Sequence, residues 1–113
     1  MVGLHKEHYG KGPTKARTIM AEDTVVCRLE DPFVRAEKTL ISMGREDEIR
    51  NMRAALSEEL RPEFVSRVER LTGRPVLAFI SEIHTNPDMA VELFVLEATE
   101  EVPGDPSAEQ VRE

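Results

Sequence analysis

The segment from Arg45 to Thr72, REDEIRNMRAALSEELRPEFVSRVERLT, carries the strongest helical pattern in the chain. Apolar side chains recur along it at every third or fourth residue. They form a single stripe of Ile49, Met52, Leu56, Leu60, Phe64, Val68 and Leu71. Pro62 interrupts the segment without changing the phase of this stripe, so we expect a kinked helix or two helices nearly in line. Gly73 and Pro75 then end it in the usual order for a helix C-terminus.

Two strand-like runs and a shorter helix precede this segment. Lys15 to Met20 and Thr24 to Glu30 are prone to β structure, and apolar and polar residues alternate in the second run, which predicts a hairpin with one buried face. Asp31 is placed to cap a helix that starts at Pro32 and stops at Gly44. Its expected buried stripe is Phe33, Ala36, Leu40 and Met43. Cys27 lies on the apolar alternation, so we expect a buried and unreactive thiol.

A second hairpin follows the long helix, with strands at Val76 to His84 and Met89 to Ala98 around the turn 85–88. In its second strand one set of alternate residues is entirely apolar: Met89, Val91, Leu93 and Val95. The other set is too apolar for plain exposure: Ala90, Glu92, Phe94, Leu96 and Ala98. The predicted fold is therefore α+β, of ββααββ order. We expect a four-stranded antiparallel sheet with a helix and a long kinked helix on one face.

Composition restricts the function. The chain has 113 residues, enough for one domain, which we place at residues 1–98, and a net charge of -7. Acidic and basic residues are interleaved, so no broad positive face is expected and nucleic-acid binding is disfavoured. No apolar run approaches the roughly 20 residues of a membrane span, so no membrane insertion is expected. Residues 99–113 read as a disordered acidic tail. One cysteine allows no internal disulfide, in keeping with a cytoplasmic protein.

A small domain with so much apolar strand surface is expected to associate. We predict a homodimer that uses the second face of the sheet or the outer edge of the long helix. The alternative is that the N-terminal segment folds back over the apolar strand residues and covers them within one chain.

The stretch before the first strand is the candidate binding site. Its two glycines can turn backbone N–H groups toward one point, and nearby basic side chains can add charge, which together form an anion nest. The candidate residues for an anion or an acidic partner are Gly10, Lys11, Gly12, Lys15 and Arg17. The spacing is not that of a nucleotide-binding P-loop. The structural alternative is that Gly10 caps a short N-terminal helix and Pro13 sets the entry to the strand.

Other candidate groups have simpler explanations. His5 and His8 are one helical turn apart, but no third metal ligand is evident, so we expect exposed histidines on a frayed turn and no metal site. Four residues of the two helices can join helix to hairpin through hydrogen bonds as readily as they can line a ligand pocket: Glu37, Lys38, Arg53 and Arg61. The chain has no recognisable nucleophile and base, and no catalytic residue or cofactor is predicted; we do not expect an enzyme.

Several separated motifs in one order resemble the MpsC-like family over roughly residues 4 to 98. The motifs are Tyr9-Gly10-Lys11-Gly12-Pro13, Ala36-Glu37-Lys38-Thr39-Leu40, Met52-Arg53, Glu59-Leu60-Arg61-Pro62-Glu63 and Leu71-Thr72-Gly73. This bacterial family is named for a sodium-translocating, membrane-potential-generating system. The resemblance implies a soluble component linked to membrane cation or inorganic-carbon transport, and it implies no catalytic residue.

The sequence therefore leads to two hypotheses. The first is a non-catalytic, cytoplasmic accessory or regulatory domain that acts through protein contacts, with itself and with a membrane-transport protein. The second is a sensor of a small anion or metabolite that uses the Gly10 to Lys15 loop as its receptor.

Overall fold

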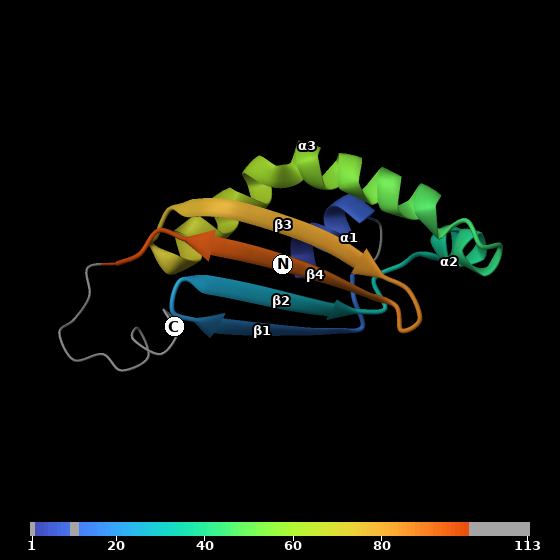
Figure 1. Ribbon diagram of the computed structural model, residues 1–113, viewed down its shortest axis with the longest axis horizontal. Coiled ribbons are helices and arrows are strands. Elements are labelled where there is room, and N and C mark those ends of the chain that lie inside the picture. Colours follow the sequence, from blue (N-terminus) through green and yellow to red (C-terminus); the bar gives the residue numbers. More distant parts are fainter. Residues whose placement is uncertain (1, 10–11, 100–113) are drawn as a thin grey trace.

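The computed structural model of the chain describes residues 2–9 and 12–99. Its elements are α1 (Val2–Tyr9), β1 (Lys15–Ala21), β2 (Thr24–Glu30), α2 (Arg35–Ser42), α3 (Glu46–Thr72), β3 (Val76–His84) and β4 (Met89–Leu96). The four strands form one antiparallel sheet in the order β1-β2-β4-β3 (Figure 1). The predicted α+β class and the ββααββ order are confirmed, with α1 added in front. The predicted acidic tail lies outside the described residues from position 100 onward.

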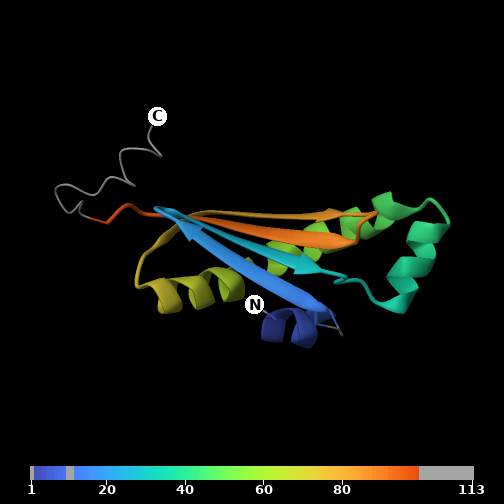
Figure 2. The same ribbon diagram turned by 90° about the horizontal axis from the view of Figure 1, so that it is seen from below.

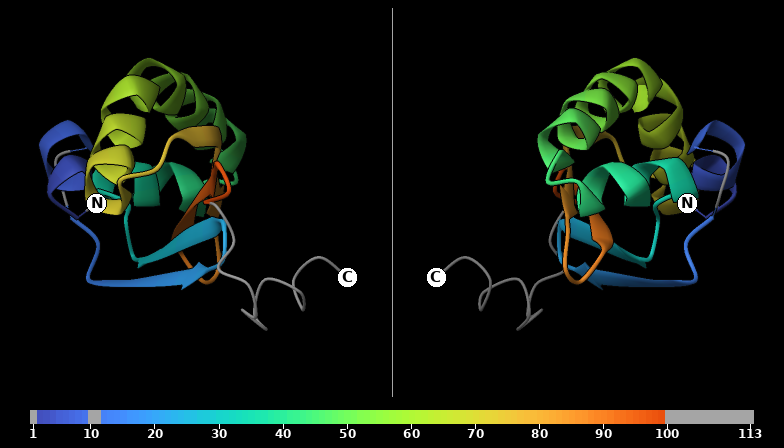
Figure 3. Two further views of the ribbon diagram at one scale, coloured as in Figure 1. Left: turned by 90° about the vertical axis from the view of Figure 1, so that its left-hand side faces the viewer. Right: turned by 90° about the vertical axis from the view of Figure 1, so that its right-hand side faces the viewer.

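The helices lie on one side of the sheet. α3 arches across the strands, α1 lies beside it, and α2 sits near the beginning of α3 at one end of the sheet (Figures 1 and 2). The views along the strands show the opposite face of the sheet without any helix over it (Figure 3). We call these two sides the helix face and the open face. α1 lies on the helix face, where Leu4 belongs to the same core cluster as Phe94 and Leu96 of β4, so the N-terminal segment does fold back over apolar strand residues there; it does not lie on the open face.

The hydrophobic core lies between the helix face and α3. Phe64 of α3 stacks on Phe79 of β3 with ring centroids 5.6 Å apart, and Phe79 stacks on Phe94 of β4 at 4.9 Å. All three rings are at most 5% exposed. Leu4 of α1 belongs to the same cluster, so the N-terminal helix is part of the core. Cys27 is buried there as predicted.

The first helix after the hairpin begins later than predicted. α2 starts at Arg35, where the backbone N–H of Val34 donates to the side chain of Glu37 at 3.0 Å. Asp31 has φ 48° and its N–H donates to the carbonyl of Asp88, so it does not cap this helix. The segment 31–34 serves to cross from the sheet to α2. Of the predicted stripe, Phe33 is buried but Met43 is 59% exposed.

The long helix runs unbroken through Pro62, but its buried stripe differs from the prediction around Met52 and at Leu71. Ile49, Phe64 and Val68 are buried as expected. Met52 and Leu71 are exposed, and the buried positions near Met52 belong to Arg53 and Ser57. Polar side chains thus face the sheet where the apolar period predicted aliphatic ones, and this displacement is the first sign of a polar site under the helices.

The helices do not cover the face of β4 that its sequence makes most apolar. The helix face receives Ala90, Glu92, Phe94 and Leu96, all nearly inaccessible to water. The entirely apolar set, Met89, Val91, Leu93 and Val95, lies on the open face and is only partly buried. The strand also ends at Leu96, before Ala98. The helices therefore cover the set that contains a carboxylate and leave the more apolar set uncovered.

Candidate functional site

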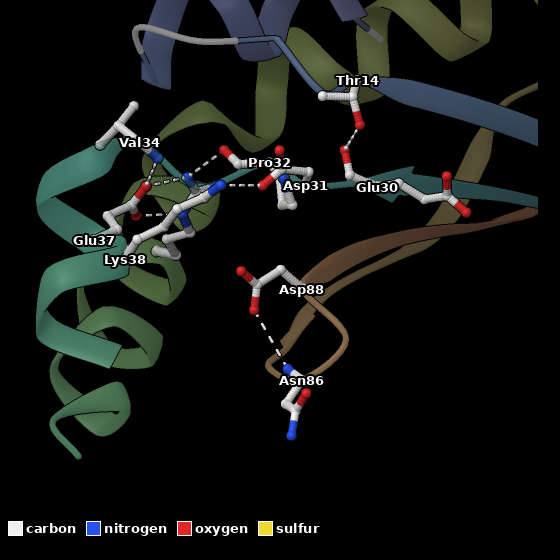
Figure 4. Close-up of polar contacts among 10 residues, drawn as sticks. Thr14, Glu30, Asp31, Pro32, Val34, Glu37, Lys38, Asn86 and Asp88 are labelled. Carbon is white, nitrogen blue, oxygen red and sulfur yellow. Dashed lines mark hydrogen bonds and ion pairs between the residues drawn. The ribbon is translucent and has the colours of Figure 1, made fainter. Parts of the chain in front are cut away.

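Arg53 of α3 ties together three parts of the chain beneath the helices. It is 5% exposed, and its Nε and Nη2 donate to the two carboxylate oxygens of Glu37 at 2.7 and 2.6 Å. Nη2 also donates to the carbonyl of Pro32 at 3.1 Å. Figure 4 shows Glu37 beside Val34, whose N–H it also accepts. The pair is bidentate and fully hydrogen-bonded, which is the arrangement in which a buried ion pair can be sustained.

Aromatic rings enclose the same guanidinium group. Its carbon lies 4.3 Å from the ring centroid of Tyr9 and 5.0 Å from that of Phe33. Arg53 therefore stacks against α1 as well as bonding to α2. On the surface nearby, Nζ of Lys38 lies 2.7 Å from Oδ1 of Asp31 (Figure 4). The hydrogen-bonded network expected at Glu37 and Arg53 is present, and it joins the helices to the segment that leaves β2.

A second pair of ionisable groups lies deeper, between α1 and the sheet. Nε2 of His5 is 3.1 Å from Oε1 of Glu92, and each side chain is 2% exposed. The imidazole packs against the rings of Tyr9 and Phe64, with centroids 5.2 and 5.6 Å away. Among the described residues, neither ring nitrogen of His5 nor Oε2 of Glu92 has a hydrogen-bond partner. Orphaned polar atoms are rare in protein interiors, and here three of them belong to one pair of side chains.

Burial moves the two proton affinities in opposite directions. Desolvation, together with the positive charge of Arg53, lowers the pKa of His5 from 6.5 to about 4. Desolvation raises the pKa of Glu92 from 4.5 to about 7, while a hydrogen bond with Ser81 and the charge of Arg53 oppose that rise. Both changes favour uncharged side chains, because an apolar surrounding penalises the charged form of each.

Hydroxyl groups connect this pair back to α1. Ser57 of α3 donates to Ser81 of β3 at 3.2 Å, and Ser81 in turn is hydrogen-bonded to Glu92. Tyr9 shares a side-chain hydrogen bond with Ser57, and burial raises the pKa of its phenol. Since His5 and Tyr9 are four residues apart on α1, one face of this helix contacts both ends of the polar chain.

The open face of the sheet is divided along the strands into an apolar and a charged half. Four residues lie side by side across all four strands: Ile19, Val26, Leu93 and Ile80. The row beside it is Ala21, Thr24, Val95 and Ala78. Ile19 and Ile80 are 58% and 53% exposed. The neighbouring row toward the other end, Arg17, Arg28, Val91 and Glu82, is largely charged. The first two rows form an apolar patch that no described helix covers.

The candidate loop residues are only partly covered by the structure. Gly10 and Lys11 lie outside the described residues, and Gly12 is half-buried. Lys15 and Arg17 are exposed on β1 and extend from the charged half of the open face. Whether the loop forms an anion nest stays a prediction, and the basic side chains it was expected to use lie beside the apolar patch.

The most unusual residues of the molecule were not selected from the sequence. His5 was expected to be exposed, which is wrong, because the ring is buried against the core. His8, one turn further along α1, is half-buried, with Nε2 2.7 Å from a carboxylate oxygen of Glu63. No cluster of three metal-ligating side chains exists among the described residues. One signal in the sequence did point to Glu92. Its neighbours on the same face of the strand, Ala90, Phe94 and Leu96, are apolar, which indicates that this face is covered.

The described residues thus form an α+β domain with one helix-covered face and one uncovered face. No helix among residues 2–9 and 12–99 has the length and apolar character to pass through a membrane. The sequence matches the family "Na+-translocating membrane potential-generating system (MpsC)" over residues 1–98. The chain belongs to the MpsC family. No curated protein matches it, and no solved structure does.

Proposed function

We propose that this chain is a non-catalytic, cytoplasmic accessory protein of a Na+-translocating system, that it acts through protein contacts, and that its working unit is a homodimer joined through the open face. The family supports the link to ion translocation. The observation that carries the protein-contact role is the uncovered row Ile19, Val26, Leu93 and Ile80.

The charge distribution on the open face favours a second copy as its occupant. The chain carries a net charge of -7, so two copies repel each other over most orientations. The open face is an exception, since its three basic residues, Lys15, Arg17 and Arg28, outnumber the acidic residues Glu30 and Glu82. Two copies can therefore approach through this face with the least repulsion.

The order of residues across the face is also self-complementary. A two-fold axis roughly parallel to the strands places β1 of one copy over β3 of the other and keeps each row opposite itself. Ile19 then packs on Ile80 of the second copy, and Val26 packs on its Leu93. In the charged row, Arg17 meets Glu82 of the second copy. Arg17 faces Arg28 within its own sheet, so the acidic partner relieves a like-charge contact.

The area is that of a modest interface. Four strands spaced about 4.8 Å apart and about 23 Å long give a projected face of roughly 450 Å². Two such faces bury on the order of 1,000 Å² of accessible surface, which is near the lower limit for a specific complex. The dimer is accordingly expected to dissociate on dilution, with a dissociation constant in the micromolar range.

Analytical ultracentrifugation of the full chain over a range of concentrations tests the dimer. We expect a dimer at about 100 µM, roughly a hundred times a micromolar dissociation constant, and a monomer for Ile80→Glu. Leu71→Glu is the matched control, because Leu71 is 77% exposed but lies on α3, the other surface considered for association. A wild-type chain that is monomeric at this concentration would falsify the proposal, as would loss of the dimer in Leu71→Glu alone.

Two further measurements separate this occupant from others. If a chain ending at residue 99 is dimeric and the full chain is monomeric, residues 100–113 occupy the face and the proposal fails. Affinity purification of wild type and Ile80→Glu from native cells tests the accessory role. We expect a membrane protein of the Na+-translocating system with the wild type; its absence from that preparation argues against this role.

A further inference from the structure

We propose that His5 and Glu92 form a one-proton site, with the proton held on the carboxyl group, and that this neutral pair fastens α1 to the sheet. The inference goes beyond the proposed function and involves the helix face alone. Its basis is the closeness of the two side chains, their burial and their orphaned polar atoms.

The distance makes sharing of a proton possible. At 3.1 Å, Nε2 of His5 and Oε1 of Glu92 are as far apart as the two heavy atoms of a hydrogen bond. With no proton between them, a buried lone pair would face a buried carboxylate, and two like acceptors repel. With two protons, an imidazolium would lie against the rings of Tyr9 and Phe64. One proton gives the two facing atoms, Nε2 of His5 and Oε1 of Glu92, one donor and one acceptor.

The surroundings decide which atom holds that proton. The ionised arrangement, imidazolium with carboxylate, buries two charges at a site where each side chain is 2% exposed. The neutral arrangement, carboxylic acid with imidazole, buries none, so it avoids the desolvation penalty of an ion pair. Burial raises the pKa of Glu92 to about 7 and lowers that of His5 to about 4, in agreement with the neutral arrangement.

No other ionisable group facing the pair reverses this assignment. α1 contributes Tyr9, α3 contributes Arg53, β2 contributes Cys27 as the cross-strand neighbour of Glu92, and β3 contributes the hydroxyl of Ser81. Arg53 disfavours an imidazolium, and the N-terminal amino group and His8 act on His5 in the same direction. The charge of Arg53 is matched by Glu37 of α2 through two hydrogen bonds. Arg53 thus favours a neutral histidine and also favours an ionised Glu92, but burial outweighs the second effect and the pKa of Glu92 stays raised.

The pair matters for α1 because side chains hold this helix in place. Among the described residues, no backbone hydrogen bond joins α1 to another element. Its attachments are Leu4 in the core, His5 on Glu92, the ring of Tyr9 on Arg53, and His8 on Glu63. When α1 leaves, His5 regains an ordinary pKa near 6.5 and Glu92 one near 4.5. Between these values the proton moves from carboxyl to imidazole, and the number of bound protons does not change.

This exchange predicts a specific response to pH. The wild-type equilibrium for α1 release should change by less than about three-fold between about pH 4.5 and 6.5, because the two groups compensate. In Glu92→Gln only the histidine titrates, so release should fall about ten-fold for each unit of rising pH. In His5→Gln only the carboxyl titrates, so release should increase about ten-fold per unit. The double variant should again be independent of pH.

Nuclear magnetic resonance of the isotope-labelled full chain provides the direct test. At about pH 5.5 we expect nitrogen shifts of a neutral imidazole for His5 and a carbon shift of a protonated carboxyl for Glu92. An imidazolium beside a carboxylate overturns the proposal, and this measurement needs no variant to fold. Amide hydrogen exchange of α1 then follows release in each variant, with Lys6→Gln, at an exposed position of the same helix, as the control that behaves as wild type. Single variants whose release does not depend on pH also overturn it.

Discussion

Glu92 and Leu93 are neighbours on β4, yet they lie on opposite faces of the sheet and in opposite environments. Glu92 is 2% exposed beneath the helices, whereas Leu93 lies in the apolar row of the open face. The usual distribution would place the carboxylate in water and the leucine in the core. Each exception has a different physical explanation: a buried polar group persists when its neighbours satisfy or neutralise it, and an uncovered apolar row is typical of an interaction surface.

The comparison indicates that the two faces contribute differently to the stability of the single chain and to association. The helix face holds one matched ion pair and one neutral pair, and both contact α1. These polar contacts therefore contribute to holding α1 on the sheet. The open face adds little to the stability of a single chain, because its aliphatic side chains remain partly in water. Its contribution is realised only when a second surface covers it.

Replacing neighbours on β4 gives the largest expected contrast between the faces. Phe94 is completely buried and stacks on Phe79, so Phe94→Ala should lower the free energy of unfolding by about 3–5 kcal/mol. Leu93→Ala should lower it by less than about 1 kcal/mol in the monomer, since water already reaches this side chain. Urea denaturation of dilute protein measures both values. Similar losses for the two variants would show that the faces are not different in this way.

The sequence was sufficient for the elements and their order because these depend on local patterns. Three such patterns depend only on residues close together in the chain. They are the alternation in 24–30, the helix-ending residues Gly73 and Pro75, and the apolar period of 45–72. All four strands and both later helices follow from them. The start of α2 was missed because Asp31 and Pro32 form a good cap by composition, whereas the segment is fixed by a long-range hydrogen bond to Asp88.

The polar site could not be found in the same way. Arg53 and Ser57 take buried positions on α3 because Glu37, Pro32 and Ser81 meet them there, and these partners are 16 to 24 residues away in the chain. His5 likewise depends on Glu92, from the other end of the domain. An apolar period assigns the hydrophobic residues of a helix to its buried face and the polar residues to its exposed face. It therefore predicts exposure for polar residues such as Arg53 and Ser57, which are buried because partners from other elements bind them.

Removal of Arg53 tests how strongly the helix face depends on its matched charges. Arg53→Met should lower the free energy of unfolding by about 3 kcal/mol, because Glu37 is then left as a buried and unpaired carboxylate. Adding Glu37→Met removes that charge, and the double variant should be more stable than Arg53→Met alone. Chemical denaturation of the three proteins provides the comparison. A double variant less stable than the single one would mean that packing around Tyr9 and Phe33 matters more than charge.

The pH dependence of stability separates the neutral pair from the ion pair. Folded Glu92 keeps its proton up to about pH 7, but the unfolded chain releases it near 4.5, so this residue makes stability fall with rising pH in that range. In the folded chain His5 stays neutral down to about pH 4, whereas in the unfolded chain it binds a proton near pH 6.5. This residue therefore makes stability rise with pH between these two values. The slopes cancel between about 4.5 and 6.5 in the wild type. Each single variant, His5→Gln or Glu92→Gln, should expose a slope of up to about 1.4 kcal/mol per pH unit, opposite in sign. Calorimetric or urea measurements at several pH values determine it, and equal slopes in the two variants would contradict the assignment.

The smallest effect expected concerns the charged row of the open face, where monomer stability and association should respond in opposite directions. Arg17 lies across from Arg28 in the sheet, so Arg17→Glu replaces a like-charge contact by an attractive one and should add roughly 0.5 kcal/mol to the stability of the monomer. In the dimer the same change places a second carboxylate opposite Glu82 of the other copy and should weaken association several-fold. Combining it with Glu82→Arg restores opposite charges between the copies, so sedimentation should show the dimer recovering. If the double variant associates no better than Arg17→Glu, the two sheets do not lie with β1 over β3, and a different orientation of the copies is required.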